Sequence, residues 1–367
     1  MSGTVIVGGG LAGAFTAALL AKSRPAPIVL ERSAAGADKV CGEFLSAEAQ
    51  TYLRQVGLDL DRLGGVPVTL ARFASGKRLA EARLPFSALG LSRGRLDEAL
   101  LQRAELLGAS VRRGVSVRRI GPDGLETTAG ALAAERIVLA SGKHDVRGAR
   151  RESEDADWGM IGFKTYFQPS RSEQRALESA VEIVLFEGGY AGLQLVEDGR
   201  LNLCLLVREA HFAELGRTWP ALLARLMEEP HLQRRLGDAD AASDRPAAIT
   251  GIPFGFLRGA SPDHRVYPVG DQAAVIASFT GDGMSIALHS AQLAASAIEH
   301  GAGPGRYLAR LQRDLGRSIG LASWLQRRAE TWPGRAATVA ALAAIPPLFS
   351  HFARATRIRG GALLAGS

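Results

Sequence analysis

The glycine-rich stretch GGGLAG near the N-terminus constrains the fold of this chain more than any other feature. It follows a short β-branched run, residues 4–7, that is typical of a buried strand. It precedes a small, apolar stretch, residues 11–22, that predicts a helix. In this setting Gly8 permits a tight turn, Gly10 lets the backbone approach a phosphate, and Gly13 allows close packing of helix and strand. The helix N-terminus favours the negative charge of a phosphate.

A second strand is predicted at residues 26–32, and Glu31 stands near its end, roughly twenty residues beyond Gly8. A carboxylate at this place accepts hydrogen bonds from a ribose diol. Strand, turn, helix and Glu31 together predict a dinucleotide-binding unit. The alternative is a glycine turn that serves packing alone. The unit by itself leaves open whether the dinucleotide is NAD or FAD.

Strands and helices alternate further along the chain. Residues 91–108 predict an amphipathic helix closed by Gly108. Residues 110–120 alternate like one strand, and residues 135–142 predict an apolar strand that runs into a glycine turn. This alternation favours a largely parallel α/β sheet.

The pattern changes near residue 151, where longer strand-like segments follow one another with few helices. IGFKTYF, VEIVLFEGGYAGLQLV and RLNLCLLV predict an antiparallel sheet, with a helical stretch after it at residues 217–235. Residues 264–271 predict a strand that ends in Gly-Asp, and residues 281–300 predict a long helix. We expect this strand and helix to rejoin the first sheet, so that the antiparallel sheet is an insertion.

Composition narrows the function classes. The chain has 367 residues and a net charge of +7, but its basic residues are scattered and not interleaved with aromatics, so nucleic-acid binding is not predicted. It lacks the run of about 18 apolar residues that a membrane span requires. The N-terminus has no charged region followed by an apolar one, as a signal peptide has. We expect a cytoplasmic protein.

The stretch KVCGEFLS, residues 39–46, holds one of the two cysteines. Cys41 has no partner cysteine in a CxxC arrangement, no histidine in the same loop and no metal-ligand spacing around it. A disulfide framework, a metal site and a reactive thiol are therefore not expected. Glu43 is the ionisable side chain of this loop with a candidate role as an acid or base. The alternative for Glu43 is a solvated carboxylate at the start of a helix.

Four motifs in this order resemble the FAD-dependent p-hydroxybenzoate-hydroxylase-like superfamily. They are VIVGGGLAG with LER, KVCGEFLS, SRGRLDEAL, and YPVGDQAA followed by FTGDGMSIAL. Within that superfamily the chain is most similar to the geranylgeranyl-reductase-type flavoproteins. The resemblance implies FAD as the cofactor and NADH or NADPH as the electron donor.

The resemblance also implies the architecture. The fold class is α/β, with a Rossmann-like FAD-binding domain (GR2-type), an inserted antiparallel β-sheet substrate domain and a helical C-terminal tail. The expected ranges are 1–150 and 264–303 for the FAD-binding domain, 151–263 for the substrate domain and 304–367 for the C-terminal helical region.

By the same resemblance, Arg93 would contact the phosphate and ribose region of FAD. The backbone at Val117 would meet the adenine, and Asp271 would bind the ribityl chain. Backbone N–H groups beside Gly281 and Gly283 would face the pyrimidine edge of the flavin, where a helix dipole stabilises negative charge. The residues expected to bind the cofactor are Gly8, Gly10, Gly13, Glu31, Arg32, Lys39, Cys41, Arg93, Val117, Gly270, Asp271, Gly281, Gly283 and Met284.

The chain departs from these relatives at three places, and one of them is Ser278 or Phe279, where relatives often place a proline. Ser141 stands where the hydroxylases carry an aspartate that is linked to cofactor and NAD(P)H handling. An aromatic strand motif of the geranylgeranyl reductases keeps Tyr190 here, but Gly192 replaces its tryptophan and Leu195 its proline. An isoprenoid-shaped pocket is therefore not expected.

The same strand is expected to roof the substrate pocket through Tyr190, Phe186 and Leu193. The candidate catalytic or pocket-lining residues are Cys41, Glu43 and Tyr190. His289, on the helix that follows the last motif, is expected to be a packing or surface residue.

The first functional expectation is an FAD-dependent monooxygenase or oxidoreductase that acts on a hydrophobic small molecule, such as an aromatic or polyketide-type substrate. The alternative is a flavin-dependent reductase of C=C bonds in prenyl or lipid chains. A binding protein without turnover is a third reading, supported by Ser141 alone. The tail PPLFSHFARATRIR suits a packed C-terminal helix. The alternatives are a peripheral contact with a membrane surface or a cover over a lipophilic substrate entrance.

Overall fold

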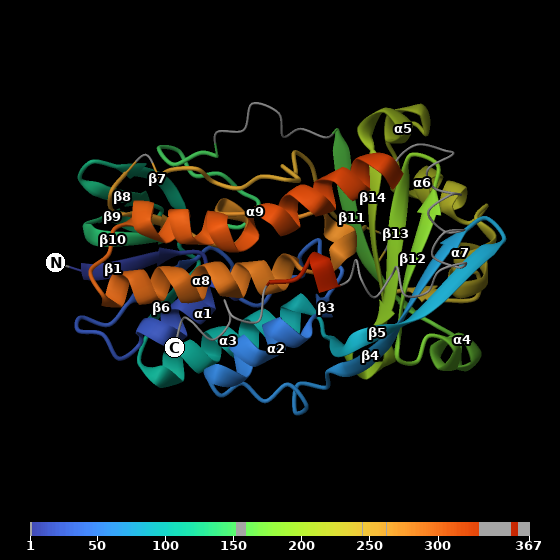
Figure 1. Cartoon of the computed structure of the whole chain (residues 1–367), viewed down its shortest axis with the longest axis horizontal. Helices are drawn as coiled ribbons and strands as arrows, with labels where there is room; N and C mark the ends of the chain where they lie inside the picture. Colours follow the sequence, from blue (N-terminus) through green and yellow to red (C-terminus); the bar gives the residue numbers. More distant parts are fainter. Residues whose placement is uncertain (1, 152–158, 244, 262, 330–353, 359–367) are drawn as a thin grey trace.

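The structure is a computed structural model, and it describes residues 2–151, 159–243, 245–261, 263–329 and 354–358. Figure 1 shows a parallel sheet with its helices at one end of the molecule and a larger sheet at the other end. The predicted α/β class is confirmed, with a Rossmann-like parallel sheet, an additional antiparallel sheet and helices toward the C-terminus.

The parallel sheet has the strand order β17-β10-β1-β2-β6, and all of its pairs are parallel. Because β17 comes from late in the chain, the segment after the antiparallel sheet does rejoin the first sheet, as the sequence predicts. The strands are β1 (Ser2–Val7), β2 (Ile28–Glu31), β6 (Ser110–Arg113), β10 (Ala134–Leu139) and β17 (Val266–Pro268).

Helices cover one face of the parallel sheet. Ile6 of β1 packs in one core with Phe15, Leu100 and Leu288 from three helices, and α9 packs along α8 (Figure 1). Small residues in α1 let it approach the sheet closely. The helices of this layer are α1 (Leu11–Leu20), α2 (Ala47–Gln55), α3 (Arg93–Leu107), α8 (Gly283–Glu299) and α9 (Pro304–Ala329).

A small antiparallel sheet covers the other face. Side chains on this second face of the parallel strands, such as Val5 and Ile137, pack against Ile120 and Leu125 of the small sheet. Its strands are β7 (Val117–Gly121), β8 (Gly124–Thr127) and β9 (Gly130–Leu132). The single strand predicted at residues 110–120 is therefore wrong. Gly114, with φ +72°, separates β6 from β7, and the two strands join different sheets.

The larger sheet has nine strands in the order β15-β11-β14-β13-β12-β4-β5-β3, with β16 paired to β11. Its pairs are antiparallel except for β12 with β4, which is parallel. The strands are β3 (Phe44–Leu45), β4 (Val66–Ser75), β5 (Arg78–Gly90), β11 (Met160–Gln168), β12 (Ala180–Phe186), β13 (Gly189–Leu195), β14 (Leu201–Arg208), β15 (Asp240–Ala241) and β16 (Ala247–Ile249).

Short helices cover the outer face of this sheet. Phe163, Leu203 and Leu205 pack there against Leu222 and Leu232. Since side chains alternate along a strand, the residues between them face inward. The helices on this side are α4 (Arg171–Ala176), α5 (Glu209–Glu214), α6 (Trp219–Leu226) and α7 (Pro230–Leu236).

Sheet membership does not follow the predicted domain ranges at every point. Strands β3, β4 and β5 fall inside the range 1–150 but pair in the nine-stranded sheet. The domain ranges themselves stay a prediction.

Part of the predicted C-terminal region, residues 330–353 and 359–367, lies outside the described residues, and so does most of the segment PPLFSHFARATRIR. In the part of the chain that the structure describes, no helix is long and apolar enough to cross a membrane.

Candidate active site

A cavity of about 1060 Å³ extends from the parallel sheet to the nine-stranded sheet. At one end it is lined by residues at the carboxyl ends of β1, β2, β10 and β17, among them Gly8, Glu31 and Gly270. At the other end it reaches the inner face of the nine-stranded sheet, at Ile183, Tyr190 and other residues. The carboxyl end of a parallel sheet is where α/β proteins bind ligands.

The glycine turn after β1 has no room for side chains. A Cβ on Gly8, which has φ +104°, would lie 2.5 Å from the carbonyl oxygen of Ala140. A Cβ on Gly13 would lie 1.9 Å from the carbonyl oxygen of Gly8. Gly8 and Gly10 line the cavity, whereas Gly13 lies behind the turn and sets the approach of α1.

Glu31 is fixed beside this turn. Its Oε2 accepts a hydrogen bond from the backbone N–H of Gly9 at 2.6 Å, and its Oε1 accepts one from Ser33 at 2.8 Å. The carboxylate lines the cavity at the end of β2. Its place fits the carboxylate expected to bind a ribose diol.

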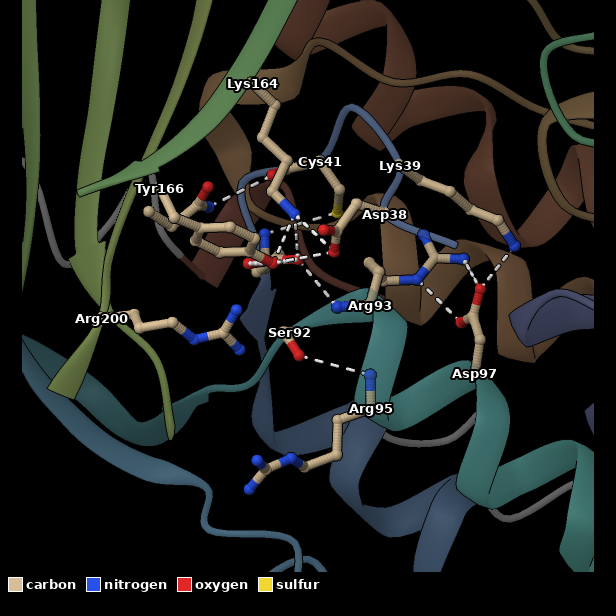
Figure 2. Close-up of polar contacts among 12 residues, drawn as sticks. Asp38, Lys39, Cys41, Ser92, Arg93, Arg95, Asp97, Lys164, Tyr166 and Arg200 are labelled. Atoms are coloured by element: carbon tan, nitrogen blue, oxygen red, sulfur yellow. Dashed lines mark hydrogen bonds and ion pairs between the residues drawn. The ribbon is translucent and has the colours of Figure 1, made fainter. Parts of the chain in front are cut away.

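Two cations face Gly10. A Cβ on this residue would lie 2.9 Å from Nζ of Lys39 and 3.9 Å from Nη2 of Arg93. Both cations converge on Asp97, which binds Lys39 at 2.6 Å and Arg93 at 2.8 and 2.9 Å (Figure 2). Burial alone would raise the pKa of Asp97, but Arg93 and Lys39 hold it below its ordinary value. A bare glycine backbone under two oriented cations fits a pyrophosphate.

Asp97 was not singled out from the sequence, although it lies four residues after Arg93 in the motif SRGRLDEAL. On a helix this spacing places two side chains on the same face. The spacing alone could have indicated the pair, whereas the approach of Lys39 from a distant loop depends on the fold.

Asp271 stands at the far side of the turn, in the short 3₁₀ segment Gly270–Gln272 that follows β17. It is half-buried and lines the cavity. Among the residues that the structure describes, its carboxylate has no hydrogen-bond or ion-pair partner, so it is available to a ligand hydroxyl. Gly270 has φ +61°, and its N–H donates to Oγ of Ser290 at 2.8 Å.

The start of α8 forms another part of the wall, through Gly281, Gly283 and Met284. Gly281 has φ +72°, and a Cβ there would lie 2.6 Å from the ring of Phe44. Gly283 is exposed, with nothing near the position of a Cβ. The N-terminal end of a long helix therefore borders the cavity, with open space beside Gly283.

Arg32, Val117 and Ser141 also line the cavity. Nη2 of Arg32 lies 2.9 Å from Nε2 of His144, and Oγ of Ser141 donates to the carbonyl oxygen of His144 at 2.6 Å. Their roles toward a cofactor, like those of the other expected site residues, stay predictions.

Glu43 is completely buried, so its interpretation as a solvated carboxylate is wrong. Its carboxylate accepts hydrogen bonds from Nζ of Lys164 at 2.7 Å, from the hydroxyl of Tyr166 at 2.8 Å and from the backbone N–H of Arg93 at 2.8 Å. Figure 2 shows how Lys164 and Tyr166 reach over the loop from the nine-stranded sheet. Burial raises the pKa of Glu43, although Lys164 opposes this.

Asp38 completes this cluster at the surface. Its Oδ1 lies 3.1 Å from the hydroxyl of Tyr166 and 3.3 Å from Nζ of Lys164. Lys164 and Tyr166 were missed from the sequence. The sequence did carry one sign of them, a lysine within the apolar strand IGFKTYF. Lys164 and Tyr166 are two positions apart, so their side chains lie on the same face of this strand, the inner one.

Further side chains of the sheet hold the loop at residues 39–43. Nδ2 of Asn202 donates to the carbonyl oxygens of Cys41 and Gly42, and Nε2 of Gln194 donates to that of Glu43. Because Cys41 and Gly42 line the cavity, these bonds shape its wall between the cofactor end and the sheet.

The cysteines are free thiols that line the cavity. Burial raises the pKa of Cys204 to about 12, so this thiol stays protonated at neutral pH. Among the described residues, no group of three or more His, Cys, Asp or Glu side chains is arranged to hold a metal ion.

The sheet end of the cavity is apolar. Tyr190 lines it, as predicted for the roof, whereas the side chains of Leu193 and Phe186 pack in the core on the outer face of the sheet. Phe186 packs in the core on the outer face, because it has the opposite parity on its strand from Ile183 and Leu185. Further apolar residues of the wall are Phe73, Val181, Leu206, Ile249, Ile252, Phe254, Val275, Phe279 and Trp324.

His289 is a buried packing residue, one of the two roles expected for it. Its ring lies 2.7 Å from the hydroxyl of Tyr52 and 3.0 Å from Oδ2 of Asp314, which joins α2, α8 and α9. It is not among the residues that line the cavity.

We expect Cys41→Ala to leave FAD binding unchanged and to alter rate or specificity only modestly, because the loop is held by its backbone and by Glu43. Binding is measured by flavin fluorescence during titration with FAD, and turnover by a steady-state assay. Complete inactivity with FAD still bound would contradict this and would make Cys41 a catalytic thiol.

Comparisons with known proteins agree with this geometry. Residues 1–138 match a family model described as an FAD binding domain. Among curated proteins, the chain is 23% identical over 334 residues to a menaquinone reductase of Mycobacterium tuberculosis (strain ATCC 25618 / H37Rv), covering 85% of this chain and 78% of that protein.

Solved structures with the same fold include flavin-dependent halogenases. The flavin-dependent brominase Bmp2 has a TM-score of 0.78 at 16% identity, covering 100% of this chain and 93% of that chain. The myxobacterial chondrochloren halogenase CndH, described as a variant of FAD-dependent halogenases, has a TM-score of 0.75 at 18% identity, covering 100% and 95%. The finer resemblance to geranylgeranyl reductases stays a prediction. The chain thus matches an FAD binding domain over residues 1–138 and shares its overall fold with the flavin-dependent halogenases.

Proposed function

We propose that this protein is an FAD-dependent monooxygenase that acts on a hydrophobic small molecule, with NADH or NADPH as the electron donor. The observation that carries the proposal is the cavity that extends from the parallel sheet to the nine-stranded sheet. One of its ends has a glycine turn, Glu31, two cations and Asp271, and its other end is apolar. When bound, the flavin supplies electron transfer and the activation of oxygen.

The residues of this chain have separate roles in the proposal. Glu31 holds the ribose diol, Lys39 and Arg93 balance the pyrophosphate charge at Gly10, and Asp271 binds the ribityl chain. The N-terminal end of α8 stabilises negative charge at the ring. The apolar wall on the sheet side excludes water and orients the substrate.

A flavin-dependent reductase of C=C bonds in prenyl or lipid chains is the second candidate. It is favoured by the similarity to the menaquinone reductase and by the aliphatic and aromatic wall of the substrate end. The two candidates need the same cofactor site but differ in their use of oxygen.

A flavin spectrum and an NAD(P)H oxidation assay, each under air and under nitrogen, separate these readings. A protein that stays colourless after reconstitution with FAD would exclude both. Oxygen uptake coupled to NAD(P)H oxidation in the presence of substrate supports the monooxygenase. Reduction of an alkene under strict exclusion of oxygen supports the reductase instead.

Asp271→Ala is expected to lower FAD occupancy sharply. Loss of hydrogen bonds to a charged group costs about 1.5–3 kcal/mol, which weakens binding by about 10- to 100-fold. Occupancy is measured as the ratio of flavin to protein absorbance after desalting. Asp61→Ala, at an exposed aspartate away from the cavity, is the matched control and should keep full occupancy. Full occupancy of Asp271→Ala would remove this residue from the site.

A further inference from the structure

The C-terminal segment at residues 354–358 returns to the wall of the cavity. Thr356 and Arg357 line it, and Ile358 is buried in the core of the parallel-sheet layer. Oγ of Ser318 on α9 donates to the carbonyl oxygen of Arg357 at 3.3 Å. This segment therefore belongs to the cavity, although the sequence placed it in a tail.

Arg357 joins three other elements. Its guanidinium forms ion pairs with Glu48 at 2.9 Å and with Asp282 at 3.3 Å. It also stacks on the ring of Phe86, 3.7 Å from the ring centroid. The residue is only 8% exposed, so these charges interact in a setting with little water.

Asp282 stands between Gly281 and Gly283, which both line the cavity. It is 1% exposed and precedes the first residue of α8, while Glu48 lies in the first turn of α2. Two carboxylates at the starts of two packed helices thus share one arginine. Without that arginine, two acidic groups would face each other in a buried place, which is costly unless one takes up a proton.

We propose that Arg357 is a positioning residue of the cavity. It bridges Asp282 and Glu48, holds the turn at residues 281–283 against the cavity, and sets the charge at the end where the flavin ring would lie. The last of these points rests on the proposed function. Arg357 acts through Asp282 and does not itself carry out a reaction step.

The protonation of Asp282 supports this role. Burial raises the pKa of Asp282 to about 7, Arg357 opposes the shift and the charge of Glu48 adds to it. Among the described residues, Arg357 and Glu48 are the charged groups that act on Asp282. The pair Asp282 and Arg357 therefore has no net charge above this pH and a net charge of one positive unit below it.

The test is the reduction potential of the bound flavin, measured against pH by equilibration with a redox dye. We expect the wild-type curve to bend near neutral pH, where Asp282 titrates. Asp282→Asn should remove the contribution of Asp282, so that its curve differs from that of the wild type in this range. Arg357→Met should move the bend upward by about one to three pH units, because loss of an opposite charge raises a carboxyl pKa by that amount. Arg357→Lys should keep most of the wild-type behaviour.

The matched control is Arg354→Met, since Arg354 is an exposed arginine of the same segment. The double variant Arg357→Met with Asp282→Asn should follow the curve of Asp282→Asn. A curve of Asp282→Asn that equals the wild-type curve, or a curve of Arg357→Met that equals that of Arg354→Met, would overturn the proposal.

A second measurement keeps this inference separate from the proposed function. The thermal midpoint of the full chain without added FAD is followed against pH. Because the folded state raises the pKa of Asp282 from 3.8 to about 7, it binds more protons in this window, and stability falls as pH rises through it. Asp282→Asn should lack that fall. If neither the wild type nor any variant binds flavin, the proposed function fails. If the thermal midpoint of Asp282→Asn falls with rising pH as that of the wild type does, the role of Arg357 and Asp282 is refuted.

Discussion

Lys164→Met is expected to lower the free energy of unfolding by about 3–5 kcal/mol, because it leaves the buried carboxylate of Glu43 without its cation. Lys164 and Glu43 are 1% and 0% exposed at the side chain, and Nζ and Oε1 lie 2.7 Å apart. The effect is measured by urea unfolding at neutral pH. The pKa of Glu43, already raised by burial, should rise further in this variant.

Two further variants make this result specific. Glu43→Gln combined with Lys164→Met removes both charges, so it should cost less than the two single changes added together. Lys77→Met, at an exposed lysine, controls for loss of charge and should change stability by less than about 0.5 kcal/mol. Equal stabilities of Lys164→Met and Lys77→Met would contradict the proposed importance of the buried pair.

Gly13→Ala is expected to weaken FAD binding by about 100-fold or more, the equivalent of about 3 kcal/mol. The new Cβ would lie 1.9 Å from the carbonyl oxygen of Gly8, which is backbone and cannot rotate away. Helix α1 must therefore shift from β1, and the turn at Gly8 and Gly10 shifts with it. Binding is measured by titration with FAD, followed by quenching of flavin fluorescence.

The matched control for this change is Gly320→Ala. Gly320 is an exposed position inside α9, and nothing lies near the place of its Cβ. Alanine there should stabilise the helix by about 0.5–1 kcal/mol and leave FAD binding unchanged. If Gly13→Ala bound FAD as the wild type does, the close approach of α1 to β1 would not be needed for the cofactor site.

Local patterns predicted the first unit well because its causes are local. The glycine spacing, the β-branched runs and Glu31 act within one βαβ segment, and the structure places them together as expected. The break between β6 and β7 was missed. The run at residues 110–120 alternates throughout, and only the left-handed backbone of Gly114 ends the first strand.

The charged surroundings of the site could not be predicted in the same way. Glu43 and Lys164 are far apart in the chain, and their pairing depends on how the loop at residues 39–43 crosses the inner face of the nine-stranded sheet. The same holds for Arg357, which reaches Asp282 from the C-terminal segment. No spacing in the sequence indicates either contact.

The sequence by itself therefore determined the α/β class and the dinucleotide turn, because glycine spacing and strand periodicity express backbone sterics over a few residues. Only the tertiary structure decided which charges are buried, which partners neutralise them and which face of each strand meets the cavity. These properties depend on the distance between atoms that the chain brings together from remote positions, and on the water that their packing excludes.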